Sequence, residues 1–204
     1  MIRNIIFDIG NVLTDFRWQD FIKDRGYAPE IGKRIGKATV EDEDWHEFDR
    51  GVWSFEELMD HFVENDPGIE KEIRETFADV TDLVVKREYA IPWIRSLKKR
   101  GYKVFVLSNF SEKAYYECAD ALSFLKETDG GILSFRDKVI KPYPEIYKLL
   151  LDRYDLVADE CVFIDDTPRN LPAAENMGIH TIPFMTKEQV DRDLERMLSG
   201  SGRA

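Results

Sequence analysis

The chain has 204 residues, enough for one large core or a core with a small appendage, and 43% of them are hydrophobic. Its formal net charge of −11 argues against a nucleic-acid partner, because phosphate backbones attract basic surfaces. No apolar run reaches transmembrane length, no secretion signal precedes the first strand pattern, and two cysteines suggest no disulfide framework. We therefore expect a cytoplasmic protein, monomeric or weakly dimeric, that acts on small molecules and binds neither nucleic acid nor membrane.

The first expected element is an apolar strand over residues 2–8, which ends on Asp8 and is followed by the turn residues Gly10 and Asn11. A short apolar run bounded by turn residues is typical of a buried strand in a parallel sheet. Open α/β sheets bind ligands at the carboxyl ends of their strands. Asp8 is therefore a candidate site residue, although an Asp at this position could also simply cap a turn.

From Arg17 to about Tyr89 the pattern predicts helices only, and we expect residues 15–89 to form an all-helical cap inserted after the first strand. Such an insert can cover the mouth of a sheet as a lid, or form a helical layer without a gating role. Helix starts are expected at Trp18, Pro29, Glu41, Ser54 and Gly68, with a capping box formed by Ser54 and Glu57. Within the insert, Trp45, Trp53 and Phe55 are expected to face the crevice.

After residue 90 the chain alternates strands and helices, which predicts parallel βαβ units. Residues 1–14 and 90–204 should therefore form an α/β core with a doubly wound, Rossmann-like parallel sheet. Strands are expected at 102–109, 130–134, 160–166 and 179–184, helices at 90–100, 141–154, 171–177 and 187–198, and a disordered polar tail at 199–204.

Polar residues follow four of these elements at the same edge of the predicted sheet. They are Asp8, Ser108 with Asn109, Lys141, and Asp165 with Asp166. Each alone has a structural explanation as a cap or a loop residue. Together they match phosphoryl transfer through a carboxylate, which needs a nucleophile, a divalent cation and donors for the phosphoryl oxygens.

These stretches resemble the four motifs of the haloacid dehalogenase superfamily, and the resemblance covers nearly all of the chain outside residues 15–90. The matching segments are Phe7–Val12, Val106–Asn109, Lys141 with Pro142, and Phe163–Asp166. The resemblance implies that Asp8 is a nucleophile that forms an aspartyl-phosphate. It implies Mg²⁺ held by Asp8, the Gly10 carbonyl and Asp166, with Asp165 nearby or acting through water. It also implies phosphate binding by Ser108, Asn109 and Lys141, with Lys141 supplying catalytic positive charge.

One position departs from the usual phosphatase pattern, in which a second Asp two residues after the nucleophile serves as general acid and base. Here that residue is Gly10, and Asn11 cannot replace it because an amide does not titrate usefully. Asp15 is titratable, but its reach is not readable from the sequence. The Asp-x-Gly-Asn-Val form resembles a subgroup that includes bacterial α-glucose-1-phosphate phosphatases. An anomeric oxygen is a good leaving group, so we expect a preference for glucose 1-phosphate over glucose 6-phosphate.

Two alternatives stay open at this point. The first is a metal-independent 2-haloacid dehalogenase of the same superfamily, which the repulsive pair Asp165 and Asp166 disfavours. The second is a non-catalytic relative that binds a phosphometabolite or a partner protein, which Gly10 keeps open. The histidines His46, His61 and His180 form no recognisable triad, and we expect structural roles for them.

Overall fold

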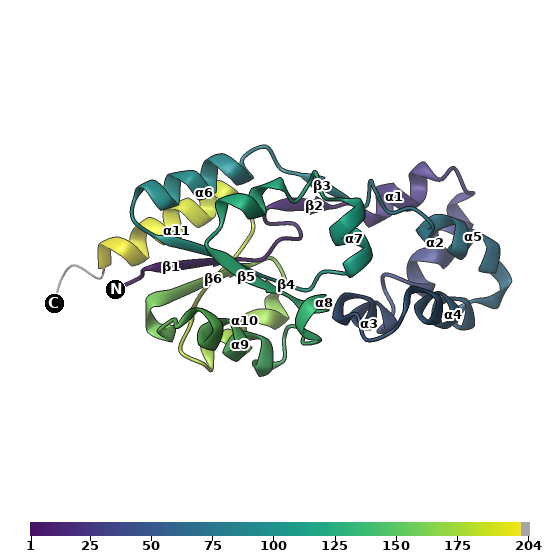
Figure 1. Ribbon diagram of the computed structural model, residues 1–204. Helices are drawn as coiled ribbons and strands as arrows, with labels where there is room; N and C mark the ends of the chain where they lie inside the picture. The colour runs from purple at the N-terminus through teal and green to yellow at the C-terminus, as the bar shows by residue number, and fades with distance from the viewer. Residues whose placement is uncertain (201–204) are drawn as a thin grey trace.

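A computed structural model describes residues 1–200, with side chains to residue 198 (Figure 1). Its main sheet has five parallel strands in the order β5-β4-β1-β6-β7. Their bounds are β1 Asn4–Phe7, β4 Lys103–Ser108, β5 Gly130–Leu133, β6 Cys161–Asp165 and β7 His180–Pro183. The parallel α/β fold predicted from the sequence is thereby confirmed. Because β1 is central, the residue after it emerges between the ends of β4 and β6.

Helices cover both faces of this sheet. Helices α6 (Ala90–Lys99) and α11 (Lys187–Gly200) lie on one face, and α9 (Pro144–Tyr154) and α10 (Leu171–Glu175) on the other (Figure 1). Strand side chains alternate between the two resulting cores: Ile5 and Phe7 pack in one, and Ile6 packs in the other. Burial on both faces explains why each strand reads as an unbroken apolar run. Helix α11 continues to Gly200, so the first two residues of the expected disordered tail are helical, and residues 201–204 lie outside the described residues.

Five helices follow the first strand and form a group at one end of the molecule (Figure 1). They are α1 Trp18–Asp24, α2 Pro29–Ala38, α3 Asp44–Arg50, α4 Phe55–Asn65 and α5 Glu70–Phe77. Their shared core centres on Trp45, which stacks on Phe62 and contacts Phe77. The predicted capping box is present: the Ser54 hydroxyl accepts the Glu57 N–H at 3.2 Å, and the Glu57 carboxylate accepts the Ser54 N–H at 2.8 Å.

A two-stranded ribbon joins the two ends of this helical group, and the sequence did not predict its second strand. Strand β2 (Thr14–Phe16) pairs antiparallel with β3 (Val84–Lys86), inside the stretch expected to be helical only. Three residues are too few to show a period of two, and the strand depends on a partner distant in the sequence. Arg87, next to β3, ties the ribbon to the first loop by donating to Asp15 at 2.8 Å and to the Asn11 carbonyl at 2.6 Å.

Three helix starts also lie later than expected, one of them that of α9, which begins at Pro144 instead of Lys141. Helix α3 begins at Asp44 instead of Glu41, because the Asp42 carboxylate accepts the Asp44 N–H and forms a turn just before the helix. Helix α5 begins at Glu70, after a short 3₁₀ turn over Pro67–Ile69. The remaining short α-helices are α7 Glu112–Glu117 and α8 Ser134–Asp137, and Ser111 caps α7 as its position suggests.

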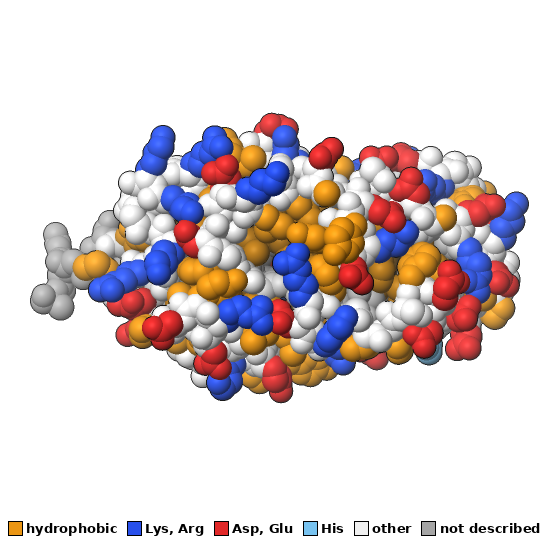
Figure 2. Space-filling view, viewed as in Figure 1, with side chains coloured by type: hydrophobic (Ala, Val, Ile, Leu, Met, Phe, Trp, Pro, Cys, Tyr) orange, Lys and Arg blue, Asp and Glu red, His pale blue; other side chains and the backbone are white. Residues whose placement is uncertain are grey.

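The charged surface is mixed. On the face in Figure 2, Lys and Arg side chains are interspersed with Asp and Glu, and hydrophobic side chains gather near the middle. This face therefore presents no continuous basic surface of the kind that binds nucleic-acid backbones. Among the described residues, no helix combines the length and apolarity needed to span a bilayer.

Candidate active site

Asp8 lies at the centre of the carboxyl edge of the sheet and is 7% exposed. Its backbone N–H donates to the Ile164 carbonyl at 2.9 Å, which fixes it beside the end of β6. Its Oδ1 accepts the Ile9 N–H at 2.7 Å, and the same oxygen lies 2.9 Å from Lys141 Nζ. The strand thus carries a carboxylate to a buried position where its orientation is fixed by the backbone.

Lys141 is the buried cation of the site, with its side chain 2% exposed. Its Nζ lies 2.9 Å from Asp8 and 2.6 Å from Asp165. Burial by itself would lower the pKa of Lys141, but the Asp165 and Asp8 carboxylates outweigh it and raise that pKa above its usual value. Lys141 is therefore charged at neutral pH.

The side chain of Asn109 is bonded to the backbone of Lys141. Its side-chain oxygen accepts the Lys141 N–H at 2.7 Å, and its Nδ2 donates to the Lys141 carbonyl at 3.0 Å. The side chain therefore clamps the backbone of Lys141, which leaves the expected role to the Asn109 backbone. Ser108, at the end of β4, is buried and near enough to Asp8 that its hydroxyl lowers the pKa of that carboxyl.

The two consecutive aspartates at the end of β6 face different surroundings. Asp165 is fully buried and accepts from Lys141, from the Thr167 N–H at 2.7 Å and from Asn170 Nδ2 at 3.0 and 3.1 Å. Asp166 is half-buried, lines the cavity, and accepts from Asn11 Nδ2 at 3.0 Å and from the Thr167 hydroxyl at 3.3 Å. Both carboxylates accept from protein donors, but Asp165 is fully buried and does not line the cavity, so Asp166 is the better placed of the two to take a ligand.

Asp8, Asp165 and Asp166 form one acidic cluster, with potential ligand oxygens within 4.8 Å of one another. The pKa of Asp8 is raised to about 7, mainly by burial, against the opposing effect of Lys141 and with a further contribution from the Asp165 and Asp166 carboxylates. Burial likewise raises the pKa of Asp166. Three carboxylates around one ammonium leave excess negative charge, and hard oxygen donors are the ligands that Mg²⁺ prefers. The donor set therefore fits a divalent cation.

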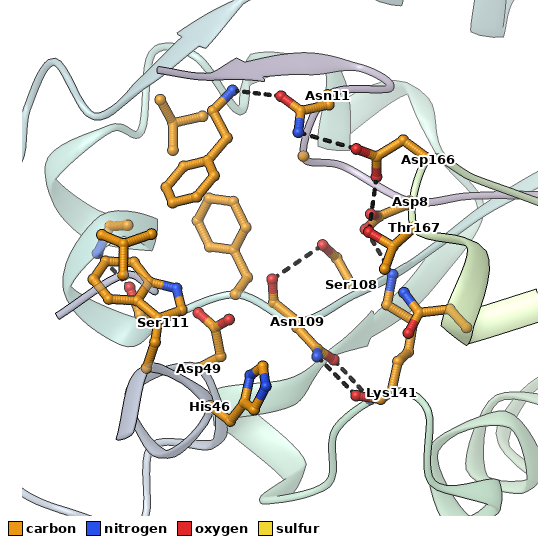
Figure 3. Close-up of a pocket in the computed structure, with 18 of the residues that line it drawn as sticks. Asp8, Asn11, His46, Asp49, Ser108, Asn109, Ser111, Lys141, Asp166 and Thr167 are labelled. Atoms are coloured by element: carbon orange, nitrogen blue, oxygen red, sulfur yellow. Dashed lines mark hydrogen bonds and ion pairs between the residues drawn. The ribbon is translucent and has the colours of Figure 1, made fainter. Parts of the chain in front are cut away.

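A cavity of about 250 Å³ opens above these groups, between the sheet edge and the helical group (Figure 3). Of the residues predicted from the sequence, the cavity is lined by Asp8, Gly10, Ser108, Asn109, Lys141 and Asp166, whereas Asp165 lies behind it. The opposite wall is largely apolar, formed by Phe16, Val40, Trp45, Leu83, Val84 and Phe110. This volume is below the 300–1,000 Å³ typical of sites for drug-sized ligands, so the cavity fits a small molecule.

Of the three aromatic residues expected to face the crevice, one lines the cavity. Trp45 lines the cavity, but Trp53 and Phe55 are not among its lining residues. Trp53 stacks on His61 with ring centroids 4.1 Å apart, and Phe55 lies under Lys113. Proximity to the turn at Gly51 did not indicate which way these rings face.

Sequence reasoning missed two polar residues that α3 places on the cavity, Asp49 and His46. His46 was expected to be structural, but it lines the cavity with its Nε2 3.1 Å from the Arg169 guanidinium. Burial and Arg169 lower the pKa of His46. Trp45 and Asp49 are four residues apart and so lie on the same face of a helix, and this spacing was the sequence signal that could have identified Asp49. Asp15, by contrast, pairs with Arg87 and is not a lining residue.

The family is shown by comparison with known proteins. The family model described as haloacid dehalogenase-like hydrolase matches residues 2–178. The chain therefore belongs to the haloacid dehalogenase-like hydrolases, as its motifs suggested.

Individual relatives are more distant. Sesquiterpene phosphatase astK of Aspergillus oryzae is 26% identical over 175 residues, which cover 85% of each protein. Mouse acyl-CoA dehydrogenase family member 10 is 28% identical across 96% of this chain, but the chain spans only 19% of that protein. A haloacid dehalogenase (HAD) family enzyme from Bacteroides thetaiotaomicron, solved with magnesium and inorganic phosphate, superposes with a TM-score of 0.69 at 23% identity, covering 92% of this chain and 96% of that one. That likeness shows a shared fold.

Proposed function

We propose that this protein is a Mg²⁺-dependent phosphatase that hydrolyses a small phosphate ester through an aspartyl-phosphate on Asp8. The observation that carries this proposal is the arrangement of three carboxylates around buried Lys141 at the floor of one small cavity. The phosphatase named among the relatives, and the related fold solved with magnesium and phosphate, support the same chemistry.

In this proposal Asp8, Asp166 and the Gly10 carbonyl hold the metal ion. When bound, Mg²⁺ offsets the repulsion between the carboxylates and the incoming phosphate and withdraws charge from the phosphoryl oxygens. Asp165 takes a positioning role, because it is fully buried, does not line the cavity, and accepts from Lys141, Thr167 and Asn170. This assignment moves Asp165 from the candidate metal ligands to the support of Lys141.

Each side chain at the site has its own part in the proposed reaction. Asp8 is held by the backbone in position to attack phosphorus. The charge of Lys141 and the hydroxyl of Ser108 contact the phosphoryl oxygens, where negative charge grows in the transition state. Asn109 fixes the backbone of Lys141 and offers its own N–H to the phosphoryl group. Fixed donors of this kind need no rearrangement as the charge develops.

We also propose that residues 1–14 and 90–204 act as the catalytic core and residues 15–89 as its cap. Helix α3 of the cap contributes Trp45, His46 and Asp49 to the cavity wall. Contact between α3 and the core would exclude water from the reacting groups and let the cap select the leaving group.

Metal dependence gives the first test. The activity of the purified protein on 4-nitrophenyl phosphate should fall by at least about 100-fold on treatment with EDTA, because the site relies on a cation for charge balance. Added Mg²⁺ should restore the activity. A metal-independent dehalogenase would instead release halide from a 2-chloro acid at the same rate with and without EDTA, and that result would reject the proposal.

A more specific proposal concerns the substrate of this phosphatase. We propose a sugar phosphate such as glucose 1-phosphate, which the motif around Gly10 suggests and the cavity volume permits. The apolar wall formed by Phe16, Val40 and Trp45 supports a second candidate, an ester of an apolar alcohol. The ratio of kcat/KM for glucose 1-phosphate, glucose 6-phosphate and a short prenyl phosphate decides between them. Equal rates on the two sugar phosphates would remove the first candidate, and a preference for the prenyl ester would select the second.

A further inference from the structure

The site lacks an obvious proton donor for the leaving group. Position 10 carries no side chain, and a Cβ placed there would meet no atom within 4 Å, so the space above the turn is open. The donor must therefore come from another wall of the cavity. Asp15 is excluded because its carboxylate pairs with Arg87, and it does not line the cavity.

Two titratable groups on α3, His46 and Asp49, face this space from the cap side, and His46 already contacts the Arg169 guanidinium, which leaves Asp49 as the candidate. Its side chain points into the cavity, opposite the sheet edge (Figure 3). Within the part of the chain whose side chains are described, no hydrogen bond or ion pair occupies its carboxylate. A half-buried carboxyl group without a protein partner is free to donate to, or accept from, a bound molecule.

The backbone around Asp49 is fixed to the core. The Ser134 hydroxyl donates to the Asp49 carbonyl, and the same hydroxyl accepts the Phe110 N–H at 2.8 Å. Gly51 ends α3 with a φ of 67°, and a Cβ there would lie 3.2 Å from Phe135 on α8, so glycine permits this close approach. The contacts connect the end of α3 to the segment just after Ser108 and Asn109, which holds Asp49 above the phosphoryl-binding residues.

The electrostatic surroundings favour the protonated form of Asp49. The pKa of this carboxyl is raised to about 7, mainly by burial and in part by the Asp8 carboxylate, while Lys141 acts to lower it. The other charged or titratable groups around it are His46 on the same helix, Asp166 and Arg169 across the cavity, and Lys138, which donates to the Gly51 carbonyl. A carboxyl that keeps its proton near neutral pH can serve as a general acid.

We propose that Asp49 is the general acid and base that replaces the side chain missing at Gly10. This proposal rests on the proposed phosphatase function. In the first step Asp8 Oδ bonds to phosphorus, the ester P–O bond breaks, and the Asp49 proton passes to the leaving oxygen to give the alcohol. In the second step water attacks phosphorus, the P–O bond to Asp8 breaks, and the Asp49 carboxylate takes the proton released by water. Phosphate leaves, and both carboxyl groups return to their starting states.

The test is Asp49→Asn, assayed against aryl and alkyl phosphates of increasing leaving-group pKa. A general acid matters most for poor leaving groups, so kcat on an alkyl ester such as glucose 6-phosphate should fall by about 10²–10³-fold. On 2,4-dinitrophenyl phosphate, whose leaving group needs no proton, the fall should stay within about 10-fold. The same variant should lose the decline in wild-type kcat/KM above about pH 7, which the proposal assigns to deprotonation of Asp49.

A rescue separates a catalytic role from a structural one. Gly10→Asp, for which the structure leaves room, should restore at least about 10-fold of the lost alkyl-ester activity when combined with Asp49→Asn. An equal loss on every ester, or no loss on any, would overturn the role of Asp49 while leaving the phosphatase proposal intact. If the wild-type protein with Mg²⁺ hydrolyses no ester at all, the proposed function itself fails.

Discussion

Asp8→Asn is expected to reduce phosphate-ester turnover by about 10⁴-fold or more, because an amide cannot act as the nucleophile. The replacement is nearly isosteric, and its side-chain oxygen can still accept the Ile9 N–H that orients Asp8. The measurement is kcat on 4-nitrophenyl phosphate at saturating Mg²⁺. Retention of more than a few per cent of the wild-type rate would show that Asp8 is not the nucleophile.

Stability provides the control for this variant. The pKa of Asp8 is raised to about 7 in the folded protein, so its contribution to folding is present at low pH and is lost as pH rises through about 7. Metal-free Asp8→Asn should therefore unfold at pH 8 at a temperature no lower than that of the wild type.

If the wild type binds phosphate but turns over no ester, the protein is instead a non-catalytic relative.

Lys141→Met should destabilise the protein by about 3–5 kcal/mol at pH 7.5 without metal, the cost typical of removing one partner of a buried ion pair. The substitution removes the only cation bonded to Asp8 and Asp165 in the described structure. The carboxylates would then repel each other without compensation, and phosphoryl oxygens would lose their buried positive charge. Urea unfolding measures the stability loss, and kcat/KM measures the catalytic loss.

Lys148→Met is the matched control, because Lys148 is also a lysine paired with an aspartate, Asp152, but its side chain is 67% exposed. Exposed pairs contribute little, so this variant should change the free energy of unfolding by less than about 1 kcal/mol. The deficit of Lys141→Met should shrink at pH 5, where Asp8 is protonated. Equal stability of the two variants would show that Lys141 does not hold the cluster together.

The parallel sheet and the residues at its edge could be predicted because both depend on local signals. Unbroken apolar runs ending on Asp8 and on Asp165 indicate strands buried on both faces, and the alternation with helices places their carboxyl ends together. Lys141 was predictable as the polar residue at the start of the expected helix 141–154, which in the structure begins three residues later, at Pro144. The joint occurrence of these residue types then indicated the chemistry.

The remaining features depend on contacts between distant segments. Strand β3 exists because β2 pairs with it, and the three residues of Val84–Lys86 carry no pattern of their own. The spacing from Trp45 places Asp49 on the same helix face, but that face points to the cavity because Ser134 and α8 fix the end of α3, which the spacing does not reveal. The different surroundings of Asp165 and Asp166 likewise follow from where Asn170 and Thr167 place their donors. Tertiary packing thus gives these two consecutive aspartates different surroundings.

Chemical trapping of the acyl phosphate tests the central proposal most directly. The protein would be mixed with 4-nitrophenyl [³²P]phosphate and Mg²⁺, quenched in acid within the first turnover, and digested for peptide mapping. We predict label on the peptide that contains Asp8, lost on addition of EDTA and absent in Asp8→Asn. Turnover without any labelled peptide, or label on a different residue, would contradict the assignment of Asp8 as the nucleophile of a metal-dependent phosphatase.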